Sequence, residues 1–299
     1  MKVVTTPKEC FENLKDYPFE PNYIAINDAL NMHYVDEGKG KTVLLLHGEP
    51  SWSYLYRKMI PILVKNGFRV IAPDLIGFGK SDKPTELTDY SYQNHLDWLT
   101  AFIEKMNLTD INLFCQDWGG LLGLHIAANH QEKFSSIVAA NTFLPNGKSS
   151  APEAFQKWKA FSQKTPDFQA GFILQGATVS DLSPEVVAAY DAPFPSDEYK
   201  AGARIFPTLV PFGDDDPYKM IPSSDAAWGK LVQWKKPFLT LFSDSDPIMN
   251  GLEKVFQKLV PGAQNQPHQI IKKGGHFLQE DKGEELAELM SEFIENQEK

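Results

Sequence analysis

Short apolar runs rich in aliphatic and β-branched residues alternate along most of this chain with longer stretches of helical character. Such alternation predicts βαβ units, in which helices cover a mostly parallel sheet. The first two runs are separated by only a few residues, which predicts that they pair as an antiparallel edge. We expect eight strands, at residues 23–26, 32–35, 43–46, 69–72, 112–115, 136–140, 238–242 and 269–271. We expect helices at residues 54–65, 92–106, 121–129, 252–259 and 284–296.

The alternation stops between residues 145 and 224. Prolines recur in this stretch, and aromatic residues sit among helical fragments without any buried-strand run. A structureless loop of that length is uncommon in a compact domain. We therefore expect a helical cap domain at 145–224, inserted into an α/β core domain made of residues 1–144 and 225–299. Such a cap would lie over the carboxyl ends of the strands, where open α/β sheets bind ligands.

Charge and cysteine content restrict the partners of the chain. Its 299 residues include 39 acidic and 29 basic side chains, for a net charge of −10. An acidic surface disfavours nucleic acid and anionic membranes as partners. Cys10 and Cys115 have neither metal nor redox spacing, which fits a reducing compartment. There is no apolar signal segment in residues 1–21 and no apolar run of about 18 residues. We expect a cytoplasmic monomer that uses no cofactor and no metal.

Residues 112–120 have the pattern of a strand, a tight turn and the start of a helix. Cys115 and Gly119 are small residues placed two positions on either side of Asp117, as in the nucleophile elbow of strand-turn-helix enzymes. Esterases and lipases carry a serine at the elevated position, whereas this chain carries a carboxylate. Asp117 therefore becomes the candidate nucleophile. The alternative is an aspartate that caps the following helix, which is a common role for this residue type.

A second motif, His47-Gly48-Glu49-Pro50, begins where the strand predicted at 43–46 ends. In folds with a nucleophile elbow, the loop after this strand supplies a backbone N–H donor to the oxyanion hole. His47 precedes the candidate nucleophile and follows an early strand. We interpret it as a buried structural histidine rather than the catalytic base.

The other two members of a catalytic triad follow the last two predicted strands. Two glycines precede His276, and they would let its loop turn the imidazole toward the elbow. After the seventh predicted strand, two aspartates compete for the role of the acid that orients the imidazole. We favour Asp246, and Asp244 is the alternative. The chain order Asp117, Asp246, His276 is nucleophile, acid, base, which is the order of the α/β-hydrolase fold.

Longer segments of the chain resemble the haloalkane dehalogenase family of the α/β-hydrolase superfamily. The resemblance is to subfamily I, which has His-Gly-Glu-Pro where other members have His-Gly-Asn-Pro. It runs from about residue 23 to the last helix and includes the cap, whereas the elbow alone is shared with epoxide hydrolases. The matching segments are 47–54 (HGEPSWSY), 72–82 (APDLIGFGKSD), 116–120 (QDWGG), 274–277 (GGHF) and, in the cap, 192–195 (APFP) and 199–202 (YKAG).

The resemblance implies an enzyme that hydrolyses short haloalkanes to an alcohol, a halide ion and a proton through a covalent alkyl ester. Its nucleophile, base and acid would be Asp117, His276 and Asp246. Glu49 and Trp118 would supply backbone N–H groups to the oxyanion hole. The Trp118 indole would also donate to the halide, together with a second indole from the cap, for which Trp158 is the matching position. Trp158 could instead pack the cap against the core.

Other functions share part of this pattern. An epoxide hydrolase uses the same Asp-His-Asp triad but needs cap tyrosines, for which Tyr190, Tyr199 and Tyr218 lie in the right region. The indole of Trp118 beside the nucleophile favours a halide. A fluoroacetate dehalogenase would need an arginine near the elbow, and none follows Gly119. A ligand-binding module that has kept the fold without the chemistry would not need a complete triad.

Overall fold

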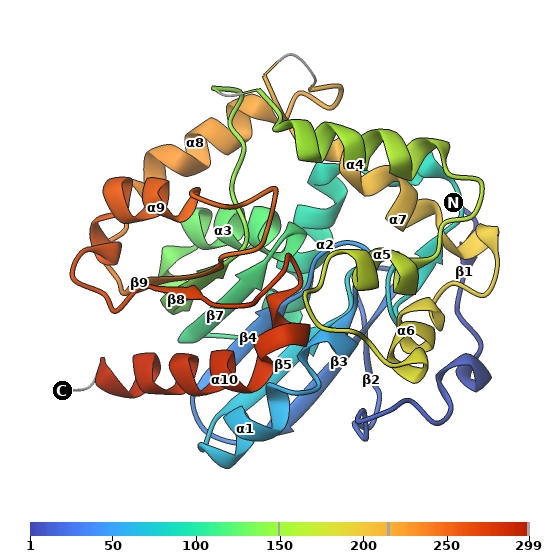
Figure 1. The fold of residues 1–299 in the computed structure, drawn as a ribbon, viewed down its shortest axis with the longest axis horizontal. Helices are drawn as coiled ribbons and strands as arrows, with labels where there is room; N and C mark the ends of the chain where they lie inside the picture. The colour runs from blue at the N-terminus through green and yellow to red at the C-terminus, as the bar shows by residue number, and fades with distance from the viewer. Residues whose placement is uncertain (149, 214–215, 298–299) are drawn as a thin grey trace.

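The computed structural model describes residues 1–148, 150–213 and 216–297. Its centre is one sheet of eight strands in the order β10-β9-β8-β7-β4-β5-β3-β2 (Figure 1). Each strand lies within a few residues of a predicted one, so the predicted α/β fold is confirmed. The strands are β2 (Asn22–Ala25), β3 (Asn31–Gly38), β4 (Thr42–Leu46), β5 (Arg69–Pro73), β7 (Ile111–Gln116), β8 (Phe134–Ala140), β9 (Phe238–Ser243) and β10 (Gln269–Ile271).

The sheet is parallel except at one edge. β2 pairs with β3 in the predicted antiparallel manner, and β3 also runs antiparallel to β5. Every residue of the central strand β7 is buried, because helices cover both faces of a sheet of this kind. A separate two-stranded ladder joins β1 (Val3–Val4) to β6 (Lys83–Pro84). Strands this short have no hydrophobic period, and none was predicted there.

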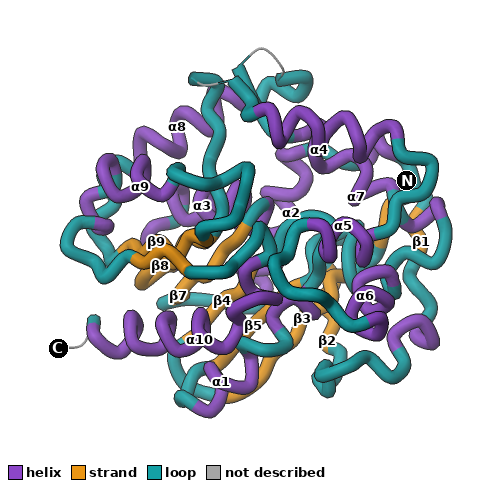
Figure 2. Tube along the Cα trace, viewed as in Figure 1, coloured by secondary structure: helices purple, strands orange, loops and turns teal. Residues whose placement is uncertain are grey.

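Helices form a layer on each face of the sheet (Figure 1, Figure 2). α1 packs against α10 on one face, and α3 packs against α2 and α8 on the other. α9 packs beside β9. These helices are α1 (Ile60–Lys65), α2 (Tyr92–Lys105), α3 (Trp118–Asn129), α8 (Ile221–Leu231), α9 (Glu253–Leu259) and α10 (Leu278–Asn296).

Two helices differ from their predicted bounds. The stretch predicted as one helix at 54–65 is a 3-10 turn at Ser53–Tyr56 followed by the shorter α1, whose first turn contains Pro61. Proline suits the first turn of a helix but not its interior, so it marks a start. α10 begins at Leu278, before the predicted residue 284, and its backbone is non-helical at Lys282. The helical spacing of apolar residues is interrupted at that kink, so the sequence pattern did not reveal the first turns of α10.

The segment between β8 and β9 is helical, and within the ranges that the structure describes it contains no strand of the main sheet. Its helices before α8 are α4 (Glu153–Lys164), α5 (Ala170–Gly176), α6 (Pro184–Asp191) and α7 (Ala201–Ile205). α8 spans residue 224, where the expected cap gives way to the core, and packs on α3. The expected division between cap and core therefore falls inside a helix that is in contact with the core.

Candidate active site

The elbow is a strained turn between β7 and α3. Asp117 has φ 48° and ψ −126°, a left-handed backbone conformation that costs a non-glycine residue about 1–3 kcal/mol. The turn is also crowded: a Cβ on Gly119 would lie 2.0 Å from the carbonyl oxygen of Leu46. The small residue predicted after the nucleophile is therefore required because the helix passes directly over the end of β4.

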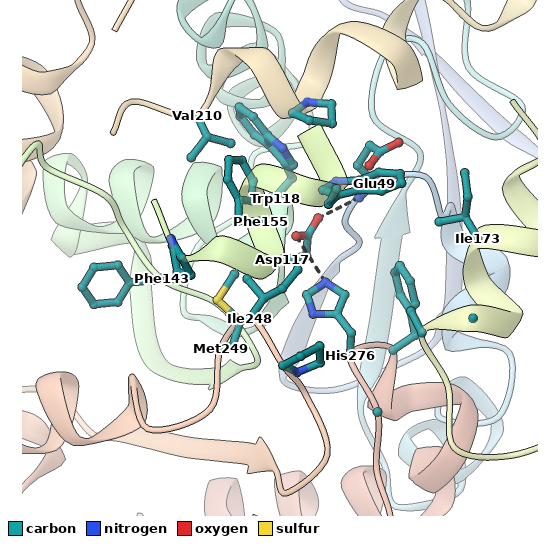
Figure 3. Close-up of a pocket in the computed structure, with 18 of the residues that line it drawn as sticks. Glu49, Asp117, Trp118, Phe143, Phe155, Ile173, Val210, Ile248, Met249 and His276 are labelled. Atoms are coloured by element: carbon teal, nitrogen blue, oxygen red, sulfur yellow. Dashed lines mark hydrogen bonds and ion pairs between the residues drawn. The ribbon is translucent and has the colours of Figure 1, made fainter. Parts of the chain in front are cut away.

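The Asp117 side chain does not cap α3, so the capping alternative is wrong. Its Oδ1 accepts a hydrogen bond from the backbone N–H of Glu49 at 2.8 Å. Its Oδ2 lies 3.4 Å from Nε2 of His276. Figure 3 shows the carboxylate directed toward the His276 ring, with Ile248 on one side of the site and Ile173 on the other. The loops after three strands thus converge on one carboxylate.

The other ring nitrogen of His276, Nδ1, contacts Asp246, which is the acid that the sequence favours. Nδ1 of His276 lies 2.7 Å from Oδ2 of Asp246. The other oxygen of Asp246 accepts the backbone N–H groups of Ile248 and Met249, and the residue is 1% exposed. Asp244 lies outside this arrangement: it accepts the backbone N–H of Lys273 at 3.0 Å on the surface of the loop.

The charges in the triad reinforce one another. Burial alone would lower the pKa of His276, but the Asp246 carboxylate and the hydrogen bonds to Asp117 and Asp246 raise it to about 10. Burial would raise the pKa of Asp246, yet the charge and hydrogen bond of His276 hold it below its usual value. The negative charges on either side of the ring therefore favour the protonated form of the imidazole in the free protein.

Glu49 contributes its backbone and its side chain in different ways. Its N–H faces Asp117, whereas its carboxyl group lies in the cavity wall. Burial, and after it the negative charge of Asp117, raises the pKa of Glu49 well above that of an ordinary carboxyl group. Trp118 follows as the first residue of α3. The first N–H groups of a helix have no acceptor within the helix, so the backbone N–H of Trp118 can be donated to a bound group.

A cavity of about 590 Å³ opens above the triad. Its wall contains Asp117, Trp118 and His276 from the core, and Trp158 from α4. Within the described part of the chain, neither Trp118 nor Trp158 has a protein acceptor for its indole N–H. The rest of the wall is mainly apolar and aromatic: Leu121, Phe143, Phe155, Phe172, Ile173, Val210, Phe212, Ile248, Met249 and Leu252 are among its members.

The wall lacks the groups that the alternative functions need. Among the described residues that line the cavity there is no tyrosine, arginine or lysine. Tyr190 is buried, and its hydroxyl donates to Glu280 in the first turn of α10. Tyr199 and Tyr218 lie outside the cavity wall as well. Its described residues therefore include neither the phenol that would protonate an epoxide oxygen nor the cation that would bind a substrate carboxylate.

Sequence reasoning missed two polar side chains that hold the histidine loop. The side-chain amide nitrogen of Gln116 donates to the carbonyl of His276 at 3.1 Å and lies 3.2 Å from its Nε2. Asn141, at the end of β8, donates to the carbonyls of Gly275 and His276. Asn141 has φ 38°, a conformation for which asparagine is enriched. An amide side chain at the carboxyl end of each of two adjacent strands was the available signal in the sequence.

His47 is not one of the residues that line the cavity. It is fully buried, its Nδ1 donates to the carbonyl of Gly48, and its Nε2 accepts the backbone N–H of Leu75. Burial lowers its pKa. Both ring nitrogens of the neutral imidazole are therefore occupied in holding loops, which is the structural role interpreted from the sequence.

Two other features concern metals and membranes. Over residues 1–148, 150–213 and 216–297, no three or more His, Cys, Asp or Glu side chains gather as a metal site would require. Over the same ranges, no helix combines the length and the apolar character needed to cross a bilayer.

Comparisons with known proteins agree with this geometry. A family model described as the alpha/beta hydrolase fold matches residues 41–283. A haloalkane dehalogenase of Psychrobacter cryohalolentis is 51% identical over 98% of both chains. Another, from Mycobacterium marinum, is 48% identical over 96% of this chain and 98% of its own. The solved tetrameric structure of a haloalkane dehalogenase from Paraglaciecola agarilytica NO2 aligns with a TM-score of 0.89 at 35% identity, covering 96% of this chain and 97% of the other.

The strand order, the elbow and the family match define the class: the chain belongs to the α/β-hydrolase fold family. Identity of about half over nearly the full length places it, within that family, among the haloalkane dehalogenases. It is accordingly a hydrolase that acts on carbon–halogen bonds.

Proposed function

We propose that this haloalkane dehalogenase works through an alkyl ester of Asp117, that its substrates are short haloalkanes, and that it belongs to subfamily I, which carries His-Gly-Glu-Pro. One observation carries the proposal: the elevated residue of the elbow is a carboxylate whose oxygens lie against a backbone N–H and an imidazole. A carboxyl group is ionised at neutral pH, since its reference pKa is about 4. Asp117 can therefore displace a halide from an sp³ carbon without a base.

The leaving halide needs hydrogen-bond donors in an apolar cavity, because an unpaired charge there is costly. An indole N–H is a donor with no acceptor site to repel an anion. Trp118 and Trp158 line the same cavity and have no described protein acceptor for their indole N–H. We assign both indoles to the halide, and this arrangement leaves the cavity apolar enough for a neutral alkyl chain.

Hydrolysis of the ester requires His276 as a base. Alkylation removes the negative charge of Asp117, which is one of the groups that raise the His276 pKa. The imidazole can then lose its proton and activate a water molecule that attacks the ester carbonyl. Asp246 stabilises the imidazolium that forms. The N–H of Glu49, already bonded to Asp117 Oδ1, and that of Trp118 would stabilise the oxyanion; removing one such donor costs about 3–4 kcal/mol elsewhere.

We assign residues 145–224 to a cap domain and residues 1–144 and 225–299 to the core, with α8 as the shared boundary helix. We also propose a cytoplasmic monomer, although the Paraglaciecola relative is tetrameric. Light scattering after size-exclusion chromatography tests the oligomeric state: a single species of about 34 kDa supports a monomer of the 33.7 kDa chain.

Halide release tests the activity and its substrate range. The protein is incubated with 1,2-dibromoethane, with 1-bromobutane and with styrene oxide, and bromide, protons and diol are measured. We expect bromide and protons in equal amounts from both haloalkanes, and no diol. The Asp117→Ala variant should release no bromide. Diol formation without bromide release, or full activity in Asp117→Ala, would contradict the proposal.

A further inference from the structure

The loop that carries His276 packs directly on one segment of the cap. Ala177 follows α5, and its carbonyl oxygen accepts the backbone N–H groups of His276 at 2.8 Å and Phe277 at 3.3 Å. A Cβ on Gly275 would lie 2.5 Å from the same carbonyl, so this approach requires glycine. The cap therefore contacts the backbone of the proposed base itself.

The same cap segment reaches from the base to the surface of the molecule. Ala177, Thr178 and Val179 all line the cavity, and Val179 is 50% exposed. Phe172, on the preceding helix α5, also lines the cavity and is 65% exposed. These apolar side chains meet both solvent and cavity, so the segment forms part of the cavity rim.

One carboxylate, that of Asp281 in the first turn of α10, joins the rim to the histidine loop. Its Oδ2 accepts the backbone N–H of Gly275 at 2.8 Å and that of Val179 at 3.0 Å. Its Oδ1 accepts the N–H of Ser180 at 2.8 Å. Hydrogen bonds to an ionised acceptor are roughly twice as strong as neutral ones, and a negative charge is favourable near a helix N-terminus. Asp281 therefore links, through hydrogen bonds, two loops that are distant from each other along the chain.

We propose that Asp281 is a positioning residue for hydrolysis of the alkyl-enzyme. This inference rests on the proposed function, because it needs an Asp117 ester and a His276 base. Asp281 holds the cap segment 177–180 and the His276 loop as one unit, which keeps the imidazole aligned with the ester carbonyl. Alkylation depends on Asp117 and the two indoles, which lie on other elements. Loss of Asp281 should therefore slow the second step and spare the first.

The variant Asp281→Asn keeps the shape of the side chain but removes its charge and one of its acceptor oxygens. Asp244→Asn is the matched control, because Asp244 also accepts a backbone N–H of the histidine loop, that of Lys273, and makes no described hydrogen bond to the cap. Rapid-quench single turnovers with 1,2-dibromoethane, read by mass spectrometry of the Asp117 peptide, give separate rates for alkylation and hydrolysis. Amide hydrogen exchange reports whether the two loops have separated.

For Asp281→Asn we expect hydrolysis to slow about 10-fold or more, since small misplacements of a catalytic group can cost up to about 100-fold. Alkylation should stay within about twofold of wild type, so that the alkyl-enzyme accumulates. Amide exchange should rise at Val179, Ser180 and Gly275. Asp244→Asn should match wild type in both steps. The conservative variant Asp281→Glu, which keeps the charge, should restore part of the hydrolysis rate.

Equal slowing of both steps, unchanged hydrolysis, or the same defect in Asp244→Asn would overturn the role of Asp281. If Asp281→Asn does not fold, Gly275→Ala separates the same two loops at a neighbouring contact, because its Cβ would press on the carbonyl of Ala177. It should show the same separation of rates, and the absence of that separation would also overturn the inference. A wild-type protein that never forms an adduct on Asp117 would instead contradict the proposed function. That result appears in the wild-type experiment, so the two failures are distinguishable.

Discussion

The Nε2 atom of His276 lies 3.4 Å from Oδ2 of Asp117, on the opposite side of the imidazole from Asp246. In the free protein this places a cation against a carboxylate. After alkylation of Asp117, the same nitrogen would face an ester. One position of the ring can therefore stabilise the nucleophile first and activate water afterwards.

Replacing His276 by phenylalanine should separate these two roles. We expect His276→Phe to release one equivalent of bromide and then stop, because Asp117 can still attack but no base activates water. The Asp117 peptide should gain the mass of one alkyl group and keep it for hours. Asp117→Ala is the control and should show neither the burst nor the adduct. Continued turnover by His276→Phe, or no adduct with a good substrate, would show that the two roles are assigned wrongly.

Stability should depend on pH through the same histidine. Its folded pKa is raised to about 10 from an unfolded value of 6.5. A raised pKa means that the folded state binds the proton more tightly, so this stabilisation is fully present below pH 6.5 and is lost as pH rises toward 10. We expect the Tm advantage of wild type over His276→Gln to be largest near pH 6 and to shrink steadily up to pH 10. An advantage that is independent of pH would contradict the ion pairs.

Halide affinity should depend on Trp158. Trp158→Phe removes an indole N–H from the cavity while keeping an aromatic ring, and a hydrogen bond to a charged group is worth about 1.5–3 kcal/mol. We expect bromide binding, measured by fluorescence quenching, to weaken about 10-fold or more. Trp234→Phe is the control, because Trp234 is buried away from the cavity and its N–H has no partner in the described part of the chain. Unchanged bromide affinity in Trp158→Phe would show that Trp158 does not bind the halide and instead packs the cap against the core.

A buried ion pair between Arg57 and Glu280 is joined by a tyrosine from α6. Arg57 donates to both oxygens of Glu280, which also accepts the hydroxyl of Tyr190 from α6. Removing one partner of a buried pair leaves an uncompensated charge, so Arg57→Met should lower the free energy of unfolding by about 3–5 kcal/mol. Chemical denaturation measures the change. Arg69→Met breaks a half-exposed pair with Asp36 and should cost about 1 kcal/mol or less; equal losses would contradict the buried character of the first pair.

Most of the sheet could be predicted from the sequence because most of its strands are short apolar runs that end at polar or turn residues. The elbow was equally visible, since small residues must surround Asp117 where a helix crosses β4. The preference for Asp246 over Asp244 agrees with the 2.7 Å contact to His276.

The contacts that support the site could not be predicted in the same way. Gln116 and Asn141 hold the histidine loop only because strands distant in sequence lie side by side. Asp281 has the appearance of an ordinary acid in a helix N-terminal turn, and the groups that donate to it are backbone N–H groups of two other loops. No local pattern encodes such tertiary contacts. The expected boundary between cap and core, near residue 224, lies within α8, which packs on α3 without any break in its own helical pattern.

The central claim is that water attacks the carboxyl carbon of Asp117 and not the alkyl carbon. A single turnover of excess enzyme with 1,2-dibromoethane in water enriched in oxygen-18 tests it directly. We expect the heavy oxygen in the Asp117 carboxylate, found by mass spectrometry of its peptide, and an alcohol that carries the light oxygen from Asp117. Heavy oxygen in the alcohol of that first turnover, with an unlabelled Asp117, would contradict the claim.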